Sequence, residues 1–157
     1  MKRFVGTGYL LNRAELAVRG CVETILEPYG LTPMQFLVLF SLRRQPGQSS
    51  AQLARAVGVR PQSMGEIIRS LRRARLIHRR ATAGEGRILR IEVSAKGDGL
   101  LDRCIPLAQQ LERELLGNFN SELLEALHQG LEALRRNAES HPTGAAARRK
   151  RPGAADA

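Results

Sequence analysis

The sequence predicts a mainly α-helical protein with one small β-hairpin. Apolar residues recur at helical spacing in the N-terminal and C-terminal parts, two capping-box sequences mark helix starts between them, and a short stretch near residue 90 alternates with a period of two. The chain has 157 residues, of which 43% are hydrophobic and 4% aromatic. This length is sufficient for one domain with a core built mainly of aliphatic side chains.

The N-terminal segment is expected to form a long helix from Phe4 to about Glu27. The Pro-Tyr-Gly sequence at 28–30 ends it. Its apolar residues fall three or four positions apart, which is typical of a helix with one apolar face. These residues are Leu10, Leu11, Ala14, Ala17, Cys21 and Ile25.

Two capping boxes predict the next two helices. Thr32-Pro33-Met34-Gln35 has proline at the first helical position and begins a helix that reaches about Gln45. Ser49-Ser50-Ala51-Gln52 repeats the pattern after a Pro-Gly turn, and its short helix ends at Gly58.

A further helix is predicted to begin at Arg60-Pro61, with a buried stripe at Met64, Ile67, Ile68 and Leu71. The two helices on either side of Gly58 are a candidate helix-turn-helix. Ala54 lies four residues before this glycine, where close packing of two helices needs a small side chain, and Met64 lies six residues after it in the core.

A two-stranded hairpin is expected within residues 77–93. Apolar residues at 89, 91 and 93 alternate with Arg90 and Glu92, and residues 83–86 supply the turn. A hairpin directly after a helix-turn-helix indicates a winged helix-turn-helix.

Helical spacing returns after Ser94, and two leucine-rich helices are predicted to extend to about residue 138. The tail, residues 140–157, contains the run Arg148-Arg149-Lys150-Arg151 among Gly, Ala and Pro and is predicted to be disordered.

Positive charge is concentrated around the predicted helix-turn-helix and wing. Residues 43–90 contain twelve arginines and two acids, Glu66 and Glu85, whereas the whole chain has a net charge of +10. A local excess of this size is the electrostatic pattern expected of a polyphosphate partner.

The outward face of the helix that begins at Pro61 carries the side chains that could enter a major groove. Those near its start, Gln62, Ser63 and Glu66, are expected to reach base edges, and Arg69, Arg72 and Arg73 to hold phosphates. Glu66 either accepts a hydrogen bond from cytosine N4 or restrains a neighbouring arginine. The face as a whole comprises Gln62, Ser63, Glu66, Arg69, Ser70 and Arg73.

These motifs together resemble the multiple-antibiotic-resistance regulator (MarR) family of bacterial winged-helix proteins. The resemblance covers residues 5–138. Val93-Ser94-Ala95-Lys96-Gly97 stands where members have Leu-Thr-x-x-Gly, Glu85-Gly86-Arg87 stands where they have Asp-x-Arg, and Arg75 replaces their usual glycine. The other matching stretches are Tyr9-Leu10-Leu11-Asn12-Arg13-Ala14, Gly30-Leu31-Thr32-Pro33-Met34-Gln35-Phe36 and Pro61-Gln62-Ser63-Met64.

The resemblance implies a MarR-type domain over residues 1–139, with dimerisation helices at about 4–28 and 95–138 and a DNA-binding unit at about 31–93. A homodimer would present two recognition helices to a pseudo-palindromic operator in double-stranded DNA. Arg87 is the expected minor-groove residue of the wing. The full set of predicted DNA contacts is Arg60, Gln62, Ser63, Glu66, Arg69, Arg72, Arg73, Arg87 and Arg90.

The resemblance also implies a transcriptional repressor that is released by a small aromatic or phenolic acid. Arg13, with Tyr9 one turn earlier, lies near where some members hold a ligand carboxylate; an intersubunit salt bridge is the alternative role for Arg13.

Other functional classes fit less well. The three histidines are scattered, and no catalytic motif, metal site or cofactor site is found in the sequence. A thiol-based redox regulator is the main alternative, although core packing explains Cys21 and Cys104 better. A sequence-tolerant nucleoid-type protein is a third. No signal peptide or membrane span is recognised, so a reduced, cytoplasmic protein is expected.

Overall fold

The structure is a computed structural model that describes residues 6–81 and 89–142. It confirms the mainly α-helical fold with one antiparallel hairpin. The residues form two compact units, Met1–Glu112 and Arg113–Ala157. In chain order the elements are α1 (Thr7–Leu26), the 3-10 turn η1 (Glu27–Tyr29), α2 (Pro33–Arg44), α3 (Ser50–Ala56), α4 (Pro61–Arg73), β1 (Ile77–Ala81), β2 (Leu89–Val93), α5 (Ala95–Leu116) and α6 (Ser121–Ser140).

Both predicted capping boxes are present. At the start of α2, the Gln35 amide N–H donates to Thr32 Oγ1 at 3.2 Å, and the Thr32 N–H donates to Gln35 Oε1 at 2.9 Å. Ser49 and Gln52 exchange the same two hydrogen bonds at the start of α3, at 3.3 and 2.8 Å. These bonds satisfy backbone donors that a helix N-terminus otherwise leaves without partners.

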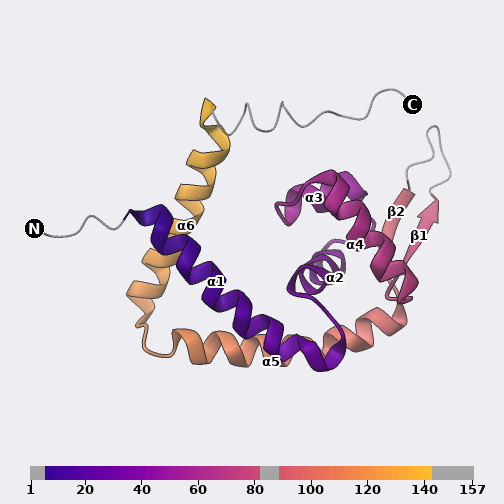
Figure 1. Cartoon of the computed structure of the whole chain (residues 1–157), viewed down its shortest axis with the longest axis horizontal. Coiled ribbons are helices and arrows are strands. Elements are labelled where there is room, and N and C mark those ends of the chain that lie inside the picture. The colour runs from indigo at the N-terminus through magenta and orange to yellow at the C-terminus, as the bar shows by residue number, and fades with distance from the viewer. Residues whose placement is uncertain (1–5, 82–88, 143–157) are drawn as a thin grey trace, which may run out of the picture. The chain divides into compact units, whose positions relative to one another are not determined.

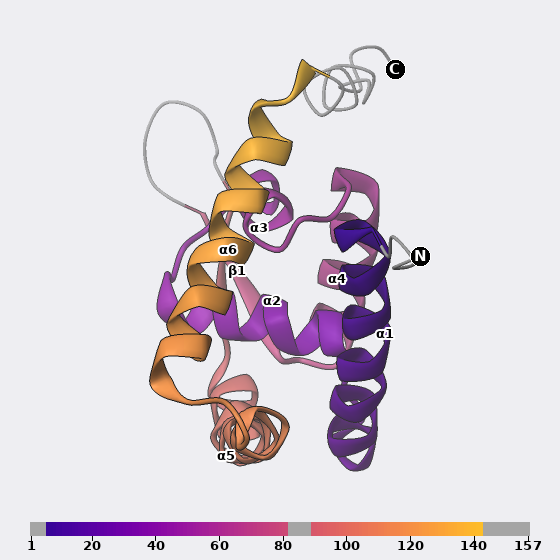
Figure 2. The same ribbon diagram turned by 90° about the vertical axis from the view of Figure 1, so that its left-hand side faces the viewer.

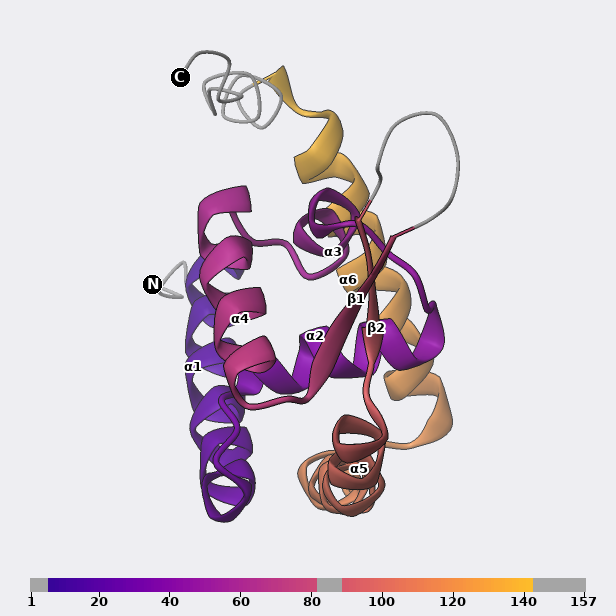
Figure 3. The same ribbon diagram turned by 90° about the vertical axis from the view of Figure 1, so that its right-hand side faces the viewer.

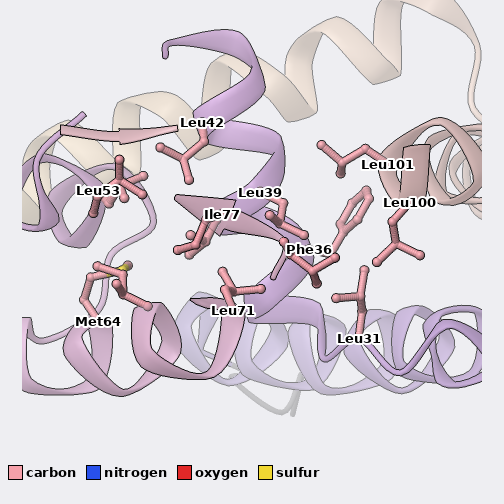
Figure 4. Packing of buried hydrophobic residues seen from close by; sticks show 14 of the residues in the cluster. Leu31, Phe36, Leu39, Leu42, Leu53, Met64, Leu71, Ile77, Leu100 and Leu101 are labelled. Carbon is pink, nitrogen blue, oxygen red and sulfur yellow. The ribbon is translucent and has the colours of Figure 1, made fainter. Parts of the chain in front are cut away.

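Helix α2 lies in the middle of the first unit, with α3, α4 and the hairpin around it (Figures 1 and 2). The core forms where these elements meet. Leu53 and Met64 lie near each other at one end, and Phe36 faces Leu100 and Leu101 at the other (Figure 4). The fully buried side chains are Leu26, Val38, Leu39, Leu42, Leu53, Met64, Ile68, Leu71, Ile91, Leu101 and Cys104.

The hairpin pairs β1 with β2 from Ile77 opposite Val93 to Ala81 opposite Leu89 (Figure 3). The turn before α3 is joined to β2 by an isolated antiparallel bridge between Gln48 and Ile91: Ile91 N–H donates to the Gln48 carbonyl at 3.0 Å, and Gly47 N–H donates to the Ile91 carbonyl at 3.1 Å. The base of the predicted wing is therefore fixed to the helix-turn-helix. The predicted turn at 83–86 lies outside the described residues.

The start of α5 is packed tightly against the turn that follows α4. Ser94 Oγ donates to the Arg75 carbonyl at 2.8 Å. Gly97 is buried, and a Cβ at this position would lie 2.2 Å from the Leu76 carbonyl oxygen. Arg75 itself has a φ of 60°, the left-handed conformation for which glycine is better suited.

Helix α5 also contacts α2 and η1 through charged side chains. Arg43 Nη1 donates to Asp102 Oδ1 at 2.6 Å, and the Arg103 guanidinium lies 5.4 Å from the centroid of the Tyr29 ring. The helix continues through Pro106.

The second unit contains α6, which begins at a cap in which Leu123 N–H donates to Asn120 Oδ1 at 2.8 Å. Arg135 donates to Glu132 at 2.6 Å and to Glu139 at 2.9 Å. The hydrogen bond from Arg135 is the main cause that lowers the pKa of Glu132. No residue of α6 is buried within the chain, although its sequence is amphipathic.

Candidate nucleic-acid interface

The turn between α3 and α4 is built as the spacing of Ala54, Gly58 and Met64 predicted. Gly58 has a φ of 73°, which glycine adopts without steric cost. Val59 N–H donates to the Ala54 carbonyl at 3.0 Å, so the chain reverses closely around α3. Ala54 and Met64 are both buried. The two helices therefore meet as a helix-turn-helix with α4 as the second, recognition helix.

The start of α4 is open to a partner. Its N-cap residue, Arg60, makes no side-chain hydrogen bond to the helix, in contrast to the full capping boxes of α2 and α3. The first-turn N–H groups and the positive end of the helix dipole are thus available to an anion such as a phosphate. Gln62, Ser63 and Glu66 are exposed on this part of the helix.

The second half of α4 carries an arginine cluster, which we define as Arg69, Arg72 and Arg73. All three are exposed and line a surface hollow of about 370 Å³. Three guanidinium groups on adjacent helical turns repel one another unless an anion lies between them. The opposite face of α4 is buried, and Ile67 is half-buried beside Met64, Ile68 and Leu71.

Ser70 differs from the expectation that it faces a groove. It is half-buried and accepts a hydrogen bond from Gln35 Nε2 at 3.0 Å. The helical spacing assigned Ser70 to the outward face, but it lies at the edge of that face, where α2 comes close. Only the tertiary contact with α2 distinguishes it from its exposed neighbours.

In the wing, the described strands present further cations. Arg80 lies directly opposite Arg90 in the β1–β2 register, and both residues are exposed. Like charges in this arrangement destabilise an isolated hairpin, which favours a polyanionic partner. Arg79 and Arg80 were absent from the predicted contacts, although the charge count of residues 43–90 included them. Arg87 lies outside the described residues.

Arg90 has a structural contact of its own. Its Nη1 donates to the Gly47 carbonyl at 2.9 Å, so the guanidinium joins the wing to the turn before α3. A guanidinium carries five N–H donors, so this bond does not prevent Arg90 from binding a phosphate as well. Next to it, His78 Nε2 lies 3.3 Å from Glu92 Oε2 across the strands.

An apolar groove of about 460 Å³ lies between α1, α2 and α5, and we call it the α1–α2 groove. This volume suits a small organic ligand. Among the described residues that line the groove, Arg19 is the only cation, and it is paired with Glu15. Neither residue was predicted as part of a site, because an i, i+4 pair on an exposed helix face has no distinguishing pattern in the sequence. The lining residues are Glu15, Val18, Arg19, Val22, Glu23, Thr32, Pro33, Met34, Phe36, Leu37 and Ala108.

The two predicted effector residues lie together but outside the lining of this groove. The Arg13 guanidinium lies 5.9 Å from the centroid of the Tyr9 ring, one helical turn away. Both residues are exposed near the start of α1.

The two cysteines differ in environment. Cys104 is fully buried, and burial raises the pKa of its thiol, while Arg103 acts in the opposite direction to a smaller extent. A thiol sensor needs an accessible thiolate, which Cys104 does not provide. Cys21 is half-buried on α1.

Among residues 6–81 and 89–142, no three His, Cys, Asp or Glu side chains gather as a metal site. No single helix in the same ranges is long and apolar enough to cross a membrane.

Comparison with known proteins identifies the family. The MarR family model matches residues 29–88. HTH-type transcriptional repressor Rv2887 of Mycobacterium tuberculosis is 34% identical over 127 residues, which are 81% of this chain and 91% of that protein. The crystal structure of Rv2887 in complex with salicylic acid has a TM-score of 0.68 at 32% identity and covers 85% of this chain and 99% of that one.

The same fold is found at greater sequence distance. The crystal structure of the S. aureus MepR–DNA complex has a TM-score of 0.78 at 20% identity, covering 87% of this chain and 99% of that one. The winged helix-turn-helix geometry and the 34% identity to a repressor over most of both chains lead to one conclusion. The chain belongs to the MarR family of winged helix-turn-helix transcriptional regulators.

Proposed function

We propose that this chain is a homodimeric repressor that binds a pseudo-palindromic operator and releases it when a small aromatic or phenolic acid binds. The observation that carries the proposal is the recognition helix, whose uncapped start presents exposed polar side chains and whose second half presents the arginine cluster. Operator DNA in a bacterium lies in the cytoplasm, and the proposed site of action is there.

Base reading is assigned to Gln62, Ser63 and Glu66, because residues at the start of a recognition helix lie deepest in the major groove. Phosphate binding is assigned to Arg60 and the arginine cluster, since guanidinium groups bind phosphate oxygens in a bidentate manner. Arg90 is assigned to the DNA phosphate backbone beside the wing, and Arg87 is assigned to the DNA minor groove.

MarR-family regulators are dimers. The apolar surface that this chain exposes on α1, α5 and α6 supports the same assembly here. Monomeric proteins seldom expose so many large apolar side chains on neighbouring helical turns. The exposed side chains on these helices and the adjoining turn are Tyr9, Leu10, Leu16, Val18, Leu107, Leu115, Phe119, Leu123, Leu131 and Leu134.

The α1–α2 groove is the proposed effector site. Its apolar lining suits an aromatic ring, and Arg19 offers a cation for a carboxylate. An acidic effector there would compete with Glu15 for the Arg19 guanidinium. The Rv2887 complex shows that one relative binds salicylic acid. Tyr9 and Arg13, at the start of the same helix, are the second proposed anchor.

A fluorescence-anisotropy titration with DNA from the protein's own upstream region tests this proposal, after a DNase footprint has located the site. Native protein should bind the footprinted duplex much more tightly than a shuffled duplex, and sodium salicylate should weaken that binding. Arg19→Ala and Arg13→Ala, compared side by side, decide which cation anchors the carboxylate. The variant without the true anchor should bind operator normally but respond to salicylate only at higher concentration.

The redox alternative is tested in the same assay. A Cys21→Ser/Cys104→Ser double variant should keep its response to salicylate. If native protein loses operator binding in peroxide and the double variant does not, the protein is controlled by its thiols. Equal affinity for the operator and the shuffled duplex would overturn the proposal of a sequence-specific repressor.

A further inference from the structure

One side chain joins the proposed effector site to the recognition helix. The Gln35 side-chain amide accepts a hydrogen bond from the Thr32 N–H at 2.9 Å through its oxygen and donates one to Ser70 Oγ at 3.0 Å through its nitrogen. The two bonds fix the orientation of the amide, because a flipped group would place its NH₂ against the Thr32 N–H, donor against donor. The amide therefore holds α2 and α4 in one relative position.

The first turn of α2 is also a wall of the α1–α2 groove. Thr32, Pro33, Met34 and Phe36 all line the groove, and Gln35 lies among them in the sequence. A ligand that enters the groove and moves α1 away from α2 therefore contacts this turn directly. The Gln35 side chain leaves the same turn toward Ser70, on the part of α4 that carries the arginine cluster.

The second capping box shows that this bridge is an addition to ordinary capping. Gln52 makes the same two bonds with Ser49, and within the described part of the chain its side chain bonds to no other element. Capping alone therefore explains Gln52, whereas the bond from Gln35 to Ser70 spans 35 positions of the chain.

We propose that Thr32, Gln35 and Ser70 form a hydrogen-bonded relay through which occupation of the α1–α2 groove repositions the recognition helix. Gln35 and Ser70 are positioning residues, and neither contacts DNA in this scheme. The inference rests on the proposed function, since it assumes that the groove is the effector site. An effector that displaces the first turn of α2 carries Gln35 with it and turns or shifts α4 in the major groove. The effector's differential affinity for the two positions of α4 supplies the driving force.

The test measures the release ratio, which is the operator dissociation constant with saturating sodium salicylate divided by the constant without it. Ser70→Ala removes the last bond of the relay but leaves the capping box of α2 intact. Its release ratio should be smaller than the native one by roughly two- to tenfold, the range that corresponds to one net hydrogen bond. Ser70→Thr keeps a hydroxyl and should restore the native ratio.

Gln35→Ala and Gln52→Ala form a matched pair of controls. Both variants lose one capping interaction, and Gln35→Ala also loses the bond to Ser70, so it should be the more destabilised of the two in thermal unfolding. Only Gln35→Ala should reduce the release ratio. If Gln52→Ala reduces the ratio equally, general loosening of the helices explains the effect, and the relay is excluded.

A groove-filling variant tests the relay without any effector. Ala108→Phe and Val18→Phe add volume from α5 and α1, respectively, to the same groove. Each should weaken operator binding in the native background and weaken it less when combined with Ser70→Ala. Sedimentation and thermal unfolding would establish that these variants remain folded dimers. If the α5 variant and the α1 variant give the same result, the conclusion does not depend on a side effect of either substitution.

The outcomes separate the two proposals. If salicylate or groove filling weakens operator binding equally with and without Ser70, the groove is regulatory and the relay is wrong. If neither treatment changes operator binding by native protein, the effector site is wrong and the relay is wrong with it. A release ratio that falls in Ser70→Ala and returns in Ser70→Thr supports both.

Discussion

At the scale of single residues, Gly97 offers the sharpest test of the packing. A Cβ there would lie 2.2 Å from the Leu76 carbonyl oxygen and 2.7 Å from Val93 Cγ1, and neither the backbone nor a β-branched side chain moves easily. Gly97→Ala should lower the free energy of unfolding by about 1–3 kcal/mol or more, as measured by urea denaturation.

Gly99 is the control for this substitution. It lies two residues later in α5, and a Cβ there would have nothing within 4 Å. Gly99→Ala should be neutral or stabilise the protein by up to about 1 kcal/mol, because alanine favours the helix. Equal destabilisation by both substitutions would contradict the close contact between α5 and the turn after α4.

The two cysteines should differ in reactivity. Burial raises the pKa of the Cys104 thiol, so at a given pH a smaller fraction is thiolate than in an unfolded chain. Iodoacetamide at pH 8 should therefore modify Cys21 well before Cys104, and urea should remove the difference. Mass spectrometry of tryptic peptides would measure both rates. Faster labelling of Cys104 in the folded protein would show that it is accessible after all.

At the scale of elements, substitutions in the two halves of α4 should have different effects: one should change the affinity for DNA and the other the sequence preference. Arg72→Ala removes a cation that we propose binds phosphate and should weaken binding to every duplex, with a decrease of about 1 in the magnitude of the slope of log K against log salt. Ser63→Ala should leave that slope unchanged and alter the preferred base at one step per half-site. Selection from randomised operators, together with salt titrations, would measure both. An unchanged site preference in Ser63→Ala would remove this residue from the base-reading set.

Most elements could be predicted from the sequence because their signals are local. The capping boxes at Thr32 and Ser49 depend on residues three positions apart. Gly58 indicates a left-handed turn whatever the structure of the residues that follow it. The hairpin followed from alternation over a few residues. The recognition helix was predicted with its buried stripe for the same reason.

The rest depends on which elements approach one another. Ser70 and its exposed neighbours have the same helical spacing, and only the approach of α2 places Gln35 beside it. Arg19 lines a groove that exists only where α1 passes α2. Gly97 is constrained by the Leu76 carbonyl, twenty-one positions away in the chain. No period or short motif encodes these distances.

At the scale of the whole molecule, the apolar surface of α1 should control assembly. Leu10 is 54% exposed, and Leu10→Glu should weaken the dimer by roughly 3–6 kcal/mol, because a two-fold interface contains each substitution twice. Asn12→Glu is the control, since position 12 lies about 200° around the helix from position 10. Sedimentation velocity over a concentration series would measure both. A Leu10→Glu protein that remains a dimer at low micromolar concentration would contradict this assignment.

Helix α1 buries only Leu26 within its own chain, although it extends over twenty residues. Its own chain therefore covers only part of the apolar surface of this helix, and the dimer interface is expected to cover more of it, so folding, subunit exchange and operator occupancy are linked equilibria. If only the dimer binds the operator tightly, the operator stabilises the dimer by the same factor by which dimerisation strengthens operator binding. A second, DNA-inactive copy of the chain in the same cell would therefore act as a dominant inhibitor, because each mixed dimer removes one functional subunit from the pool that can occupy both half-sites.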